Sequence, residues 1–272
     1  MKKPLMFAAV SAAAMLGSPL VSANEELNFD AYREMLADGN PAELYEMEGE
    51  ELWRTARGPK NATLEQCDLG LGPGVVEGAA AQLPRYFEDT GKVQDLESRL
   101  LSCMETQQGI APAEVVNGSF GKGERAKVAA LVAYVVTHSK GKPIAVDLSH
   151  PKMKEMYDMG ERVFYYRTGV MDFACSSCHS QDDKRIRATR LPNITKPEGA
   201  AEGWSSWPAY RVSNSQFWTM QHRLWDCFRQ QRTAEPVFAS DVTIALSVFM
   251  AGKGQWRRGQ VAGREALRER TK

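Results

Sequence analysis

The sequence lacks an excess of charge of either sign, because its 272 residues include 34 acidic and 34 basic side chains. A nucleic-acid-binding surface needs a basic excess, so the composition argues against a nucleic-acid partner. The chain also lacks a long apolar run after its first residues, whereas a membrane helix needs about 20 consecutive apolar residues. We therefore expect a mature chain without a membrane span.

The beginning of the chain has the pattern of a secretory signal. Lys2 and Lys3 give a positive start, and an apolar run follows from Leu5 to Leu16. Val21-Ser22-Ala23 then fits the small-x-small cleavage pattern. An uncleaved anchor is the alternative, but this run is too short to cross a bilayer. We predict a signal peptide over residues 1–23, cleavage before Asn24 and export to the periplasm.

Convincing hairpin signals are missing as well, and the apolar residues follow helical spacing. Five segments have this pattern: 93–104, 127–136, 151–167, 215–229 and 241–251. A further helix is expected to start at Asn40-Pro41, and Asp241 and Gly252 are expected to cap and stop the last helix. The sequence therefore predicts an all-α fold with long loops.

The two halves of the chain share a short pattern. "RLLSC" at 99–103 and "RLWDC" at 223–227 both read Arg-Leu-x-x-Cys, and Leu-Pro precedes each, at 83–84 and at 191–192. Coincidence is the alternative for such short identities. The repeat predicts two tandem domains, 24–150 and 151–272, that meet where Gly and Pro cluster in "SKGKPIAVDLSHP".

An odd number of cysteines, five, is unusual for an exported chain, so at least one has a role outside a disulfide. "CSSCH" at 175–179 is the attachment motif of a c-type haem, in which two thiols bond the vinyl groups and the histidine binds iron. A redox C-x-x-C would favour a βαβ setting, and a zinc site needs a second ligand pair. Neither is evident, so we predict a haem c.

The remaining cysteines divide into a pair and a single residue. Cys67 and Cys103 lie in the same predicted domain of an exported chain, which favours a disulfide over two buried thiols. Their bond would close a loop of about 36 residues, worth about 3–4 kcal/mol on chain-entropy grounds. Cys227 is then left without a cysteine partner.

Four long segments of the chain resemble one known family. They are "GPKNATLEQCDLGLGPG", "LPRYFEDTGKVQDLESRLLSCM", "FACSSCHSQ" and "WPAYRVSNSQFWTMQHRLWDCFRQQR". They are similar to SoxA, the c-type cytochrome subunit of the sulfur-oxidising L-cysteine S-thiosulfotransferase. The resemblance implies two cytochrome-c-like domains, a small cytochrome partner of the SoxX type, and oxidative coupling of thiosulfate to a cysteine of a SoxYZ-type carrier.

Some members of this family carry two haems, and this chain departs from their pattern. "CDLGL" at 67–71 has neither a second cysteine nor a histidine. The chain therefore resembles the branch with one haem, in which the first domain lacks haem and its two cysteines, here Cys67 and Cys103, form a disulfide.

The resemblance also assigns roles to individual residues. It implies that Cys175 and Cys178 attach the haem, that His179 is the proximal iron ligand, and that Cys227 is both the distal ligand and a cysteine persulfide. It assigns substrate binding to Arg223. The residues agree, because Arg223 and Cys227 are four apart and share a helix face, where a guanidinium lowers a thiol pKa and suits an oxyanion. The alternative is that Arg223 and Cys227 are an ordinary i, i+4 pair on a solvent-exposed helix face, with no role in function.

Other readings of the site stay open at this point. Met220, His222 and Met250 follow the haem motif and could supply the distal ligand, as in many electron-transfer cytochromes. The leading hypothesis is an enzyme that oxidises thiosulfate at Cys227. The alternatives are a simple electron-transfer cytochrome and a haem peroxidase or sensor.

The haem count is directly testable. An intact-mass measurement of the mature protein should show one covalent haem, because only "CSSCH" supplies both thiols and the histidine. Replacing Cys175 or Cys178 by alanine should abolish stable attachment. Two haems on one chain would contradict the interpretation of the first domain.

Overall fold

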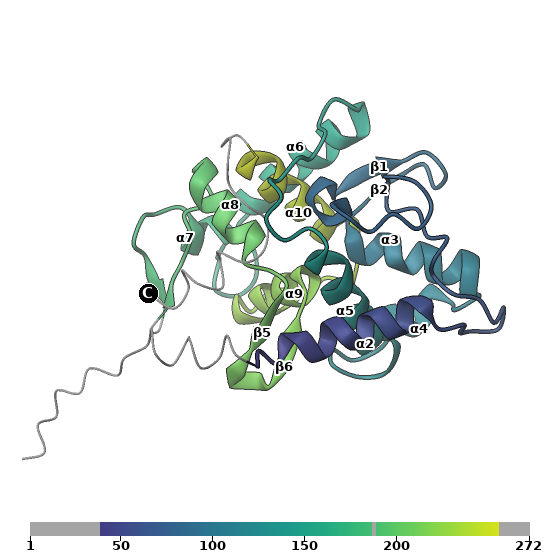
Figure 1. The fold of residues 1–272 in the computed structure, drawn as a ribbon. Helices are drawn as coiled ribbons and strands as arrows, with labels where there is room; N and C mark the ends of the chain where they lie inside the picture. The colour runs from purple at the N-terminus through teal and green to yellow at the C-terminus, as the bar shows by residue number, and fades with distance from the viewer. Residues whose placement is uncertain (1–38, 187–188, 256–272) are drawn as a thin grey trace, which may run out of the picture.

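The computed structural model describes residues 39–186 and 189–255, and these are mostly helical (Figure 1). The predicted signal peptide, 1–23, lies outside the described residues. The helices are α2 (Ala42–Arg54), α3 (Leu96–Cys103), α4 (Pro112–Val116), α5 (Gly123–Thr137), α6 (Pro151–Tyr165), α7 (Cys175–His179), α8 (Pro197–Ser205), α9 (Met220–Gln230) and α10 (Asp241–Gly254). Within those ranges no helix combines the length and the apolar character needed to cross a bilayer.

The expectation of an all-α fold is wrong in one respect, because three small antiparallel sheets are present. They pair β1 (Arg85–Phe87) with β2 (Lys92–Gln94), β3 (Arg185–Ile186) with β4 (Thr189–Arg190), and β5 (Ala209–Arg211) with β6 (Gln216–Trp218). Arg85 lies opposite Gln94, and Ala209 opposite Trp218. Strands of two or three residues are too short to show the alternation by which a sequence reveals a strand.

Two of the predicted helices begin later than expected, because a short strand occupies the first residues of each predicted segment. Segment 93–104 contains the end of β2 before α3, and segment 215–229 contains β6 before α9. A polar cap marks each true start: Asp95 Oδ1 accepts from Ser98 N at 2.9 Å, and Thr219 Oγ1 accepts from His222 N at 3.4 Å. Hydrophobic periodicity alone did not separate the strand from the helix that follows it.

The other helix limits agree more closely with the sequence. Asn40 Oδ1 accepts from Ala42 N at 3.0 Å, and α2 begins at Ala42, one residue after the predicted first helical position at Pro41. Helix α5 covers the expected segment 127–136, whereas α6 starts as expected at Pro151 but ends at Tyr165, before the predicted end at residue 167. The last helix runs past the predicted stop at Gly252 to Gly254, and its cap is Ser240 rather than Asp241.

The same helix contact occurs in both halves of the chain. Helix α2 packs on α5 so closely that a Cβ added at Gly49 would lie 2.0 Å from Ala130 O. Helix α6 packs on α10 in the same way, and a Cβ at Gly160 would lie 2.0 Å from Ala245 O. Only glycine permits two helix backbones to approach this closely.

The order of elements around these contacts also repeats. An X-Pro pair, a hairpin, a capped helix and a long helix follow one another in each half. The proline that corresponds to Leu83-Pro84 is in Trp207-Pro208, directly before β5, and not in Leu191-Pro192 as the sequence pattern suggested. The second Leu-Pro match was therefore fortuitous.

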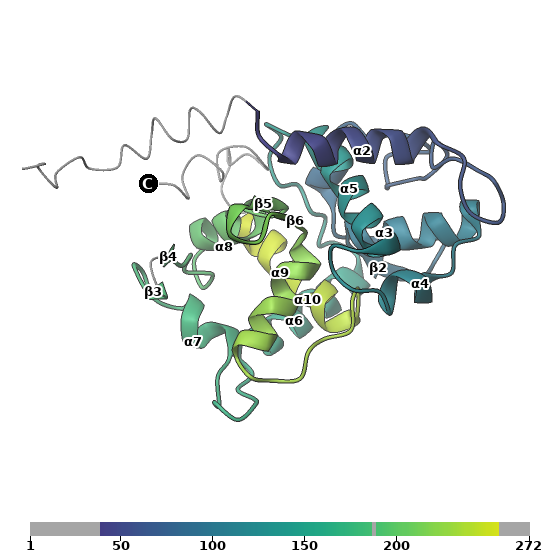
Figure 2. The same cartoon turned by 90° about the horizontal axis from the view of Figure 1, so that it is seen from below.

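The two halves, coloured purple to teal and green to yellow in Figure 2, share buried surface. One apolar cluster combines Val93, Ile144 and Val146 with Met153, Ile244 and Val248. Phe238, which precedes α10, is buried in the core of the N-terminal half. The halves therefore form one packed body, so that elements of one half bear directly on elements of the other.

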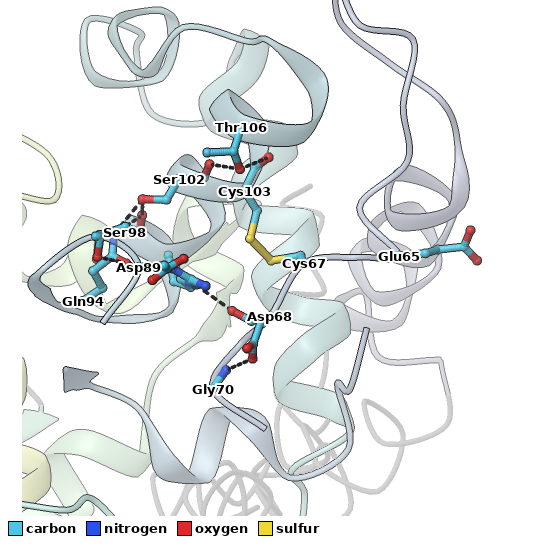
Figure 3. Close-up of a disulfide and its surroundings, with 12 residues drawn as sticks. Glu65, Cys67, Asp68, Gly70, Asp89, Gln94, Ser98, Ser102, Cys103 and Thr106 are labelled. Carbon is cyan, nitrogen blue, oxygen red and sulfur yellow. Dashed lines mark hydrogen bonds and ion pairs between the residues drawn. A yellow bond between two sulfur atoms is a disulfide. The ribbon is translucent and has the colours of Figure 1, made fainter. Parts of the chain in front are cut away.

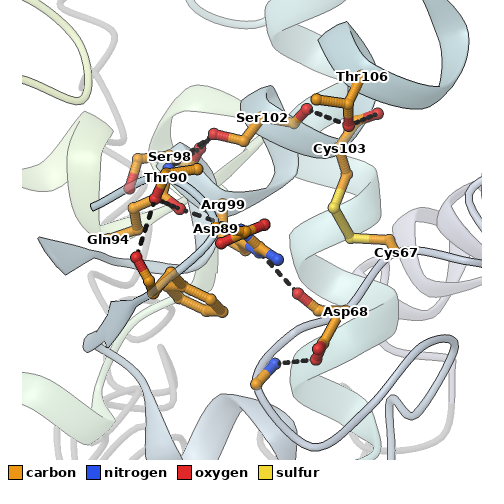
Figure 4. A network of polar contacts seen from close by, with 12 residues as sticks. Cys67, Asp68, Asp89, Thr90, Gln94, Ser98, Arg99, Ser102, Cys103 and Thr106 are labelled. Carbon is orange, nitrogen blue, oxygen red and sulfur yellow. Dashed lines mark hydrogen bonds and ion pairs between the residues drawn. A yellow bond between two sulfur atoms is a disulfide. The ribbon is translucent and has the colours of Figure 1, made fainter. Parts of the chain in front are cut away.

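The predicted disulfide between Cys67 and Cys103 is confirmed and closes a loop with a sequence separation of 36 (Figure 3). Arg99, one turn before Cys103, stabilises the same region (Figure 4). Its Nε donates to Asp68 O at 2.6 Å, its Nη1 pairs with Asp89, and the guanidinium lies 3.9 Å from the Phe87 ring centroid. The Arg-Leu-x-x-Cys pattern of the N-terminal half is thus wholly structural.

Any side chain at Gly160, where α6 contacts α10, should lower the stability of the protein. We expect Gly160→Ala to destabilise the protein by about 1–3 kcal/mol or more, because its methyl group would overlap backbone. Gly203→Ala in α8 is the matched control, since its Cβ would meet only side chains at 3.4 Å or beyond. That variant should be neutral or gain up to about 1 kcal/mol from helix propensity. Equal effects of the two substitutions in denaturant unfolding would contradict the proposed close contact.

Candidate functional site

A cavity of about 480 Å³ lies in the C-terminal half between α7, α9 and α10. Its size is within the range of cofactor and ligand sites, about 300–1,000 Å³. All five residues that the sequence singled out for this site line it: Cys175, Cys178, His179, Arg223 and Cys227. The fold therefore brings together two segments that lie some 45 residues apart in the sequence.

Helix α7 consists of the "CSSCH" motif itself. Cys175 and Cys178 are one turn apart, and neither forms a disulfide. His179 Nδ1 lies 2.9 Å from Pro192 O, and since a carbonyl oxygen only accepts, Nδ1 carries the proton. The lone pair is then on Nε2, the form of imidazole that binds a metal. This donor set fits a covalently attached haem.

Helix α9 supplies the opposite wall with Met220, Arg223, Leu224 and Cys227. Their spacing of three and four residues places them on one face of the helix. Arg223 also lies 5.6 Å from the centroid of the Trp207 ring, which packs beside it on the cavity. The predicted shared face of Arg223 and Cys227 is confirmed, and it faces a cavity rather than bulk solvent.

Asp226 contacts the predicted substrate-binding residue Arg223 and was not predicted from the sequence. This buried carboxylate accepts from Arg223 at 3.0 Å, from Arg229 at 2.7 Å and from Gln230 at 2.6 Å. Burial alone would raise the pKa of Asp226, but these hydrogen bonds and the arginine charges hold it below its ordinary value. An ionised Asp226 fixes the orientation of Arg223. The signal was an aspartate flanked by arginines at three residues on either side.

The expected lowering of the Cys227 pKa by Arg223 is only a partial effect. Burial raises the pKa of the Cys227 thiol, and the Arg223 charge opposes that rise without overcoming it. Arg211, on β5, contributes a second positive charge that lowers the Cys227 pKa. Its guanidinium lies 4.7 Å from the Trp218 ring centroid and it also lines the cavity. Arg211 was not predicted from the sequence, because it lies on a strand too short to be predicted.

The three other candidates for the distal ligand differ in position. Met220 and Met250 line the cavity, whereas His222 is not among the residues that line it. The His222 ring instead stacks between Phe120 and Trp218, with both centroid distances 3.9 Å. Burial lowers the pKa of His222 to about 4, so its ring is neutral at pH 7. The structure thus removes His222 from the cavity and leaves the two methionines in it.

The zinc alternative gains no support. Within residues 39–186 and 189–255, no group of three or more His, Cys, Asp or Glu side chains is arranged to hold a metal ion. The thioredoxin-like alternative lacks its setting too, since the "CSSCH" helix is not part of a βαβ unit in the described structure.

A helix carrying two thiols and an oriented imidazole against such a cavity defines a c-type cytochrome. The family model described as SoxA/TsdA, cytochrome c domain, matches residues 48–144. The L-cysteine S-thiosulfotransferase subunit SoxA of Hydrogenophilus thermoluteolus is 66% identical over 225 residues, 83% of this chain and 82% of that one. This chain belongs to the SoxA family, the catalytic subunits of thiosulfate-oxidising L-cysteine S-thiosulfotransferases.

More distant proteins agree with this assignment. A SoxA subunit of Hydrogenobacter thermophilus is 34% identical over 212 residues, 78% of this chain and 76% of that one. The crystal structure of SoxXA from P. pantotrophus superposes with a TM-score of 0.68 at 23% identity, covering 86% of this chain and 83% of that one. The superposition on the P. pantotrophus structure supports the fold of this chain.

The buried His222 predicts a pH dependence of stability. Its folded pKa is lowered from 6.5 to about 4, so the unfolded state takes up the proton first as the pH falls, and stability is lost between about pH 6.5 and pH 4. Between pH 7 and pH 5, wild type should lose about 2 kcal/mol more than His222→Gln in urea unfolding. Burial also raises the pKa of Glu97 to about 8, but this contribution to the pH dependence is present in both proteins and cancels in the difference. Equal losses would contradict the neutral, buried state of His222.

Proposed function

We propose that this chain, exported to the periplasm by its signal peptide 1–23, is the subunit in which Cys227 carries the sulfur chemistry of thiosulfate oxidation. The observation that supports this most directly is the shared cavity: Arg223 and Cys227 on α9 face the same space as "CSSCH" on α7. An anion-binding group, a sulfur nucleophile and a redox cofactor would then meet at one place.

One haem c would be held by four residues of the C-terminal half. Cys175 and Cys178 would attach it, and His179 and Cys227 would bind the iron. A haem bound there supplies one-electron redox chemistry. The N-terminal half has no equivalent donor set, because Cys67 and Cys103 are joined to each other and "CDLGL" contains no histidine. We therefore assign one haem to the chain.

Arg223 would bind the sulfonate end of thiosulfate. Asp226 holds the Arg223 guanidinium at 3.0 Å, and Arg211 adds a second positive charge near Cys227. A planar guanidinium donates two parallel hydrogen bonds to an oxyanion. Bound in this way, thiosulfate would present its sulfane sulfur, the end without oxygens, to Cys227.

The chemistry balances if Cys227 carries a persulfide. The terminal persulfide sulfur forms an S–S bond with the sulfane sulfur of thiosulfate, and two electrons leave singly for an electron-accepting cytochrome c. The thiolate of a carrier cysteine then attacks the sulfane sulfur that bears the sulfonate. This step yields the carrier S-thiosulfonate and releases the Cys227 persulfide for another cycle.

The domains and partners follow the same proposal. Residues 24–150 and 151–272 would be two tandem cytochrome-c-like domains, the first without haem, and the repeated helix contacts at Gly49 and Gly160 support this division. The partners would be a SoxX-type small cytochrome and a SoxYZ-type carrier, with thiosulfate as the small substrate. The similar fold of the P. pantotrophus SoxXA structure supports the proposal of a SoxX-type partner.

A simple electron-transfer cytochrome is the second candidate function. It is favoured by Met220 and Met250, because either methionine lines the cavity and could be a distal ligand. In that case Cys227 would have no part in turnover, which separates the two functions experimentally.

Substitutions at Cys227 and Arg223 test the proposal. Cys227→Ala should retain covalent haem, change its spectrum and abolish thiosulfate-dependent cytochrome reduction. Arg223→Ala should keep haem and fold but lose about 10- to 150-fold in kcat/KM for thiosulfate, as for a lost charge-assisted hydrogen bond. Intact mass should also reveal an extra sulfur on Cys227 that a reductant removes.

Arg167→Ala is the control, because Arg167 pairs with Asp172 on the exposed surface. It should leave thiosulfate kinetics unchanged. Thiosulfate turnover that survives Cys227→Ala, in the presence of both partners, would rule out the enzymatic role of Cys227 and favour the electron-transfer alternative.

A further inference from the structure

Gln221, in the first turn of α9, joins the two halves of the molecule. Its Nε2 donates to Asp95 Oδ2 at 2.5 Å, its backbone N donates to Glu97 Oε1 at 3.2 Å, and its Oε1 accepts from Ala239 N at 3.0 Å. Gln221 and Asp95 are each 1% exposed and Glu97 is 4% exposed. Two carboxylates of the N-terminal half therefore hold the first turn of the helix that carries the site.

The electrostatics of this junction explain why two acids are buried there. Asp95 caps α3 and Thr219 caps α9, so two helix N-termini with partial positive charge begin at the same junction. Gln221 N is one of the donors that a helix start leaves without an intrahelical partner, and Glu97 accepts from it. Burial and the Asp95 charge raise the pKa of Glu97 to about 8.

The junction is connected to the site by one rigid helix. Gln221 and Cys227 are six residues apart, a rise of about 9 Å. Arg223 and Cys227 lie roughly 200–240° around α9 from Gln221, so the junction and the cavity are on opposite sides of the helix. A turn or slide of α9 at Gln221 would displace both site residues together.

A second contact between the halves adjoins the first. His222 stacks on Phe120 of the N-terminal half with a centroid distance of 3.9 Å. Gln221 thus anchors α9 through hydrogen bonds, and His222 anchors it through a ring contact. The partners in both cases belong to the N-terminal half.

We propose that Asp95 and Glu97 are positioning residues for Arg223 and Cys227, acting through Gln221, so that the N-terminal half sets the placement of the sulfur-bearing helix. This inference rests on the proposed function, because it takes Cys227 as the sulfur-bearing and iron-binding residue. The N-terminal half then contributes to turnover without supplying any group that touches substrate.

Gln221→Met tests the role of the junction in the haem-loaded complex with its partners. This variant keeps the side-chain size and removes both side-chain hydrogen bonds. Gln108→Met is the matched control, because Gln108 is equally buried and its Nε2 donates at 3.1 Å to Ala62 O, within the N-terminal half. Both variants should lower the denaturation midpoint. Only Gln221→Met should shift the haem reduction potential and low-spin EPR spectrum and lower kcat for thiosulfate, by about 10- to 100-fold.

A pair of substitutions at Glu97 separates hydrogen bonding from packing. Glu97→Gln keeps an acceptor for Gln221 N and resembles the protonated acid, so its potential and kcat should match wild type. Glu97→Leu removes the acceptor and should behave as Gln221→Met does. If Gln221→Met does not fold, Gln221→Asn, which shortens the side chain by one methylene, is measured against the same criteria.

Two results would overturn the inference. One is a Gln221 variant that loses stability as Gln108→Met does but keeps the wild-type potential, EPR spectrum and kcat. The other is a Glu97→Leu variant with wild-type turnover and spectrum. Cys227→Ala, measured in parallel, identifies which idea failed: unchanged turnover there overturns the proposed function, whereas lost turnover there leaves only the positioning role in question.

Discussion

The contact between α6 and α10 at Gly160 is the constraint on which the cavity depends. With no side chain at this position, the backbones meet at Ala245, and α10 presents Leu246 and Met250 to the cavity while α6 presents Phe164. A wider separation would enlarge the space into which the "CSSCH" helix faces. The identical contact of α2 with α5 builds the N-terminal core in the same way, so one rule of helix packing produces both halves.

The two halves use the same pattern of residues for different purposes. In α3, Arg99 and Cys103 are turned into the core, where the arginine holds Asp89 and Asp68 and the cysteine is oxidised. In α9, Arg223 and Cys227 face a cavity, and Asp226 orients the arginine. The difference lies in what surrounds each helix. Helix α3 presents its arginine and cysteine to a packed loop, whereas α9 presents the same two residue types to a cavity.

Sequence alone was sufficient for the parts of the site that are local. "CSSCH" occupies a single helix, and Arg223 and Cys227 share one face of another, so spacing along the chain determined their geometry. The disulfide was also predictable, since Cys67 and Cys103 were the cysteines left in one half of the chain.

The remaining features depend on contacts between distant segments, which spacing does not encode. Gln221 owes its role to Asp95 and Glu97, more than 120 positions earlier. Arg211 reaches the cavity only because a three-residue strand turns it there. The net rise of the Cys227 pKa reflects burial, which follows from the packing of α9 and not from the arginine four residues away.

The burial of the disulfide separates two of the five cysteines of this chain from the other three. Thiol–disulfide exchange requires an attacking thiolate to reach a sulfur atom, and Cys67 and Cys103 are 0% and 3% exposed. Once the N-terminal half has folded, its disulfide is therefore out of reach of Cys175, Cys178 and Cys227. The packed N-terminal core thus acts as a barrier to exchange between its disulfide and the three thiols of the C-terminal half.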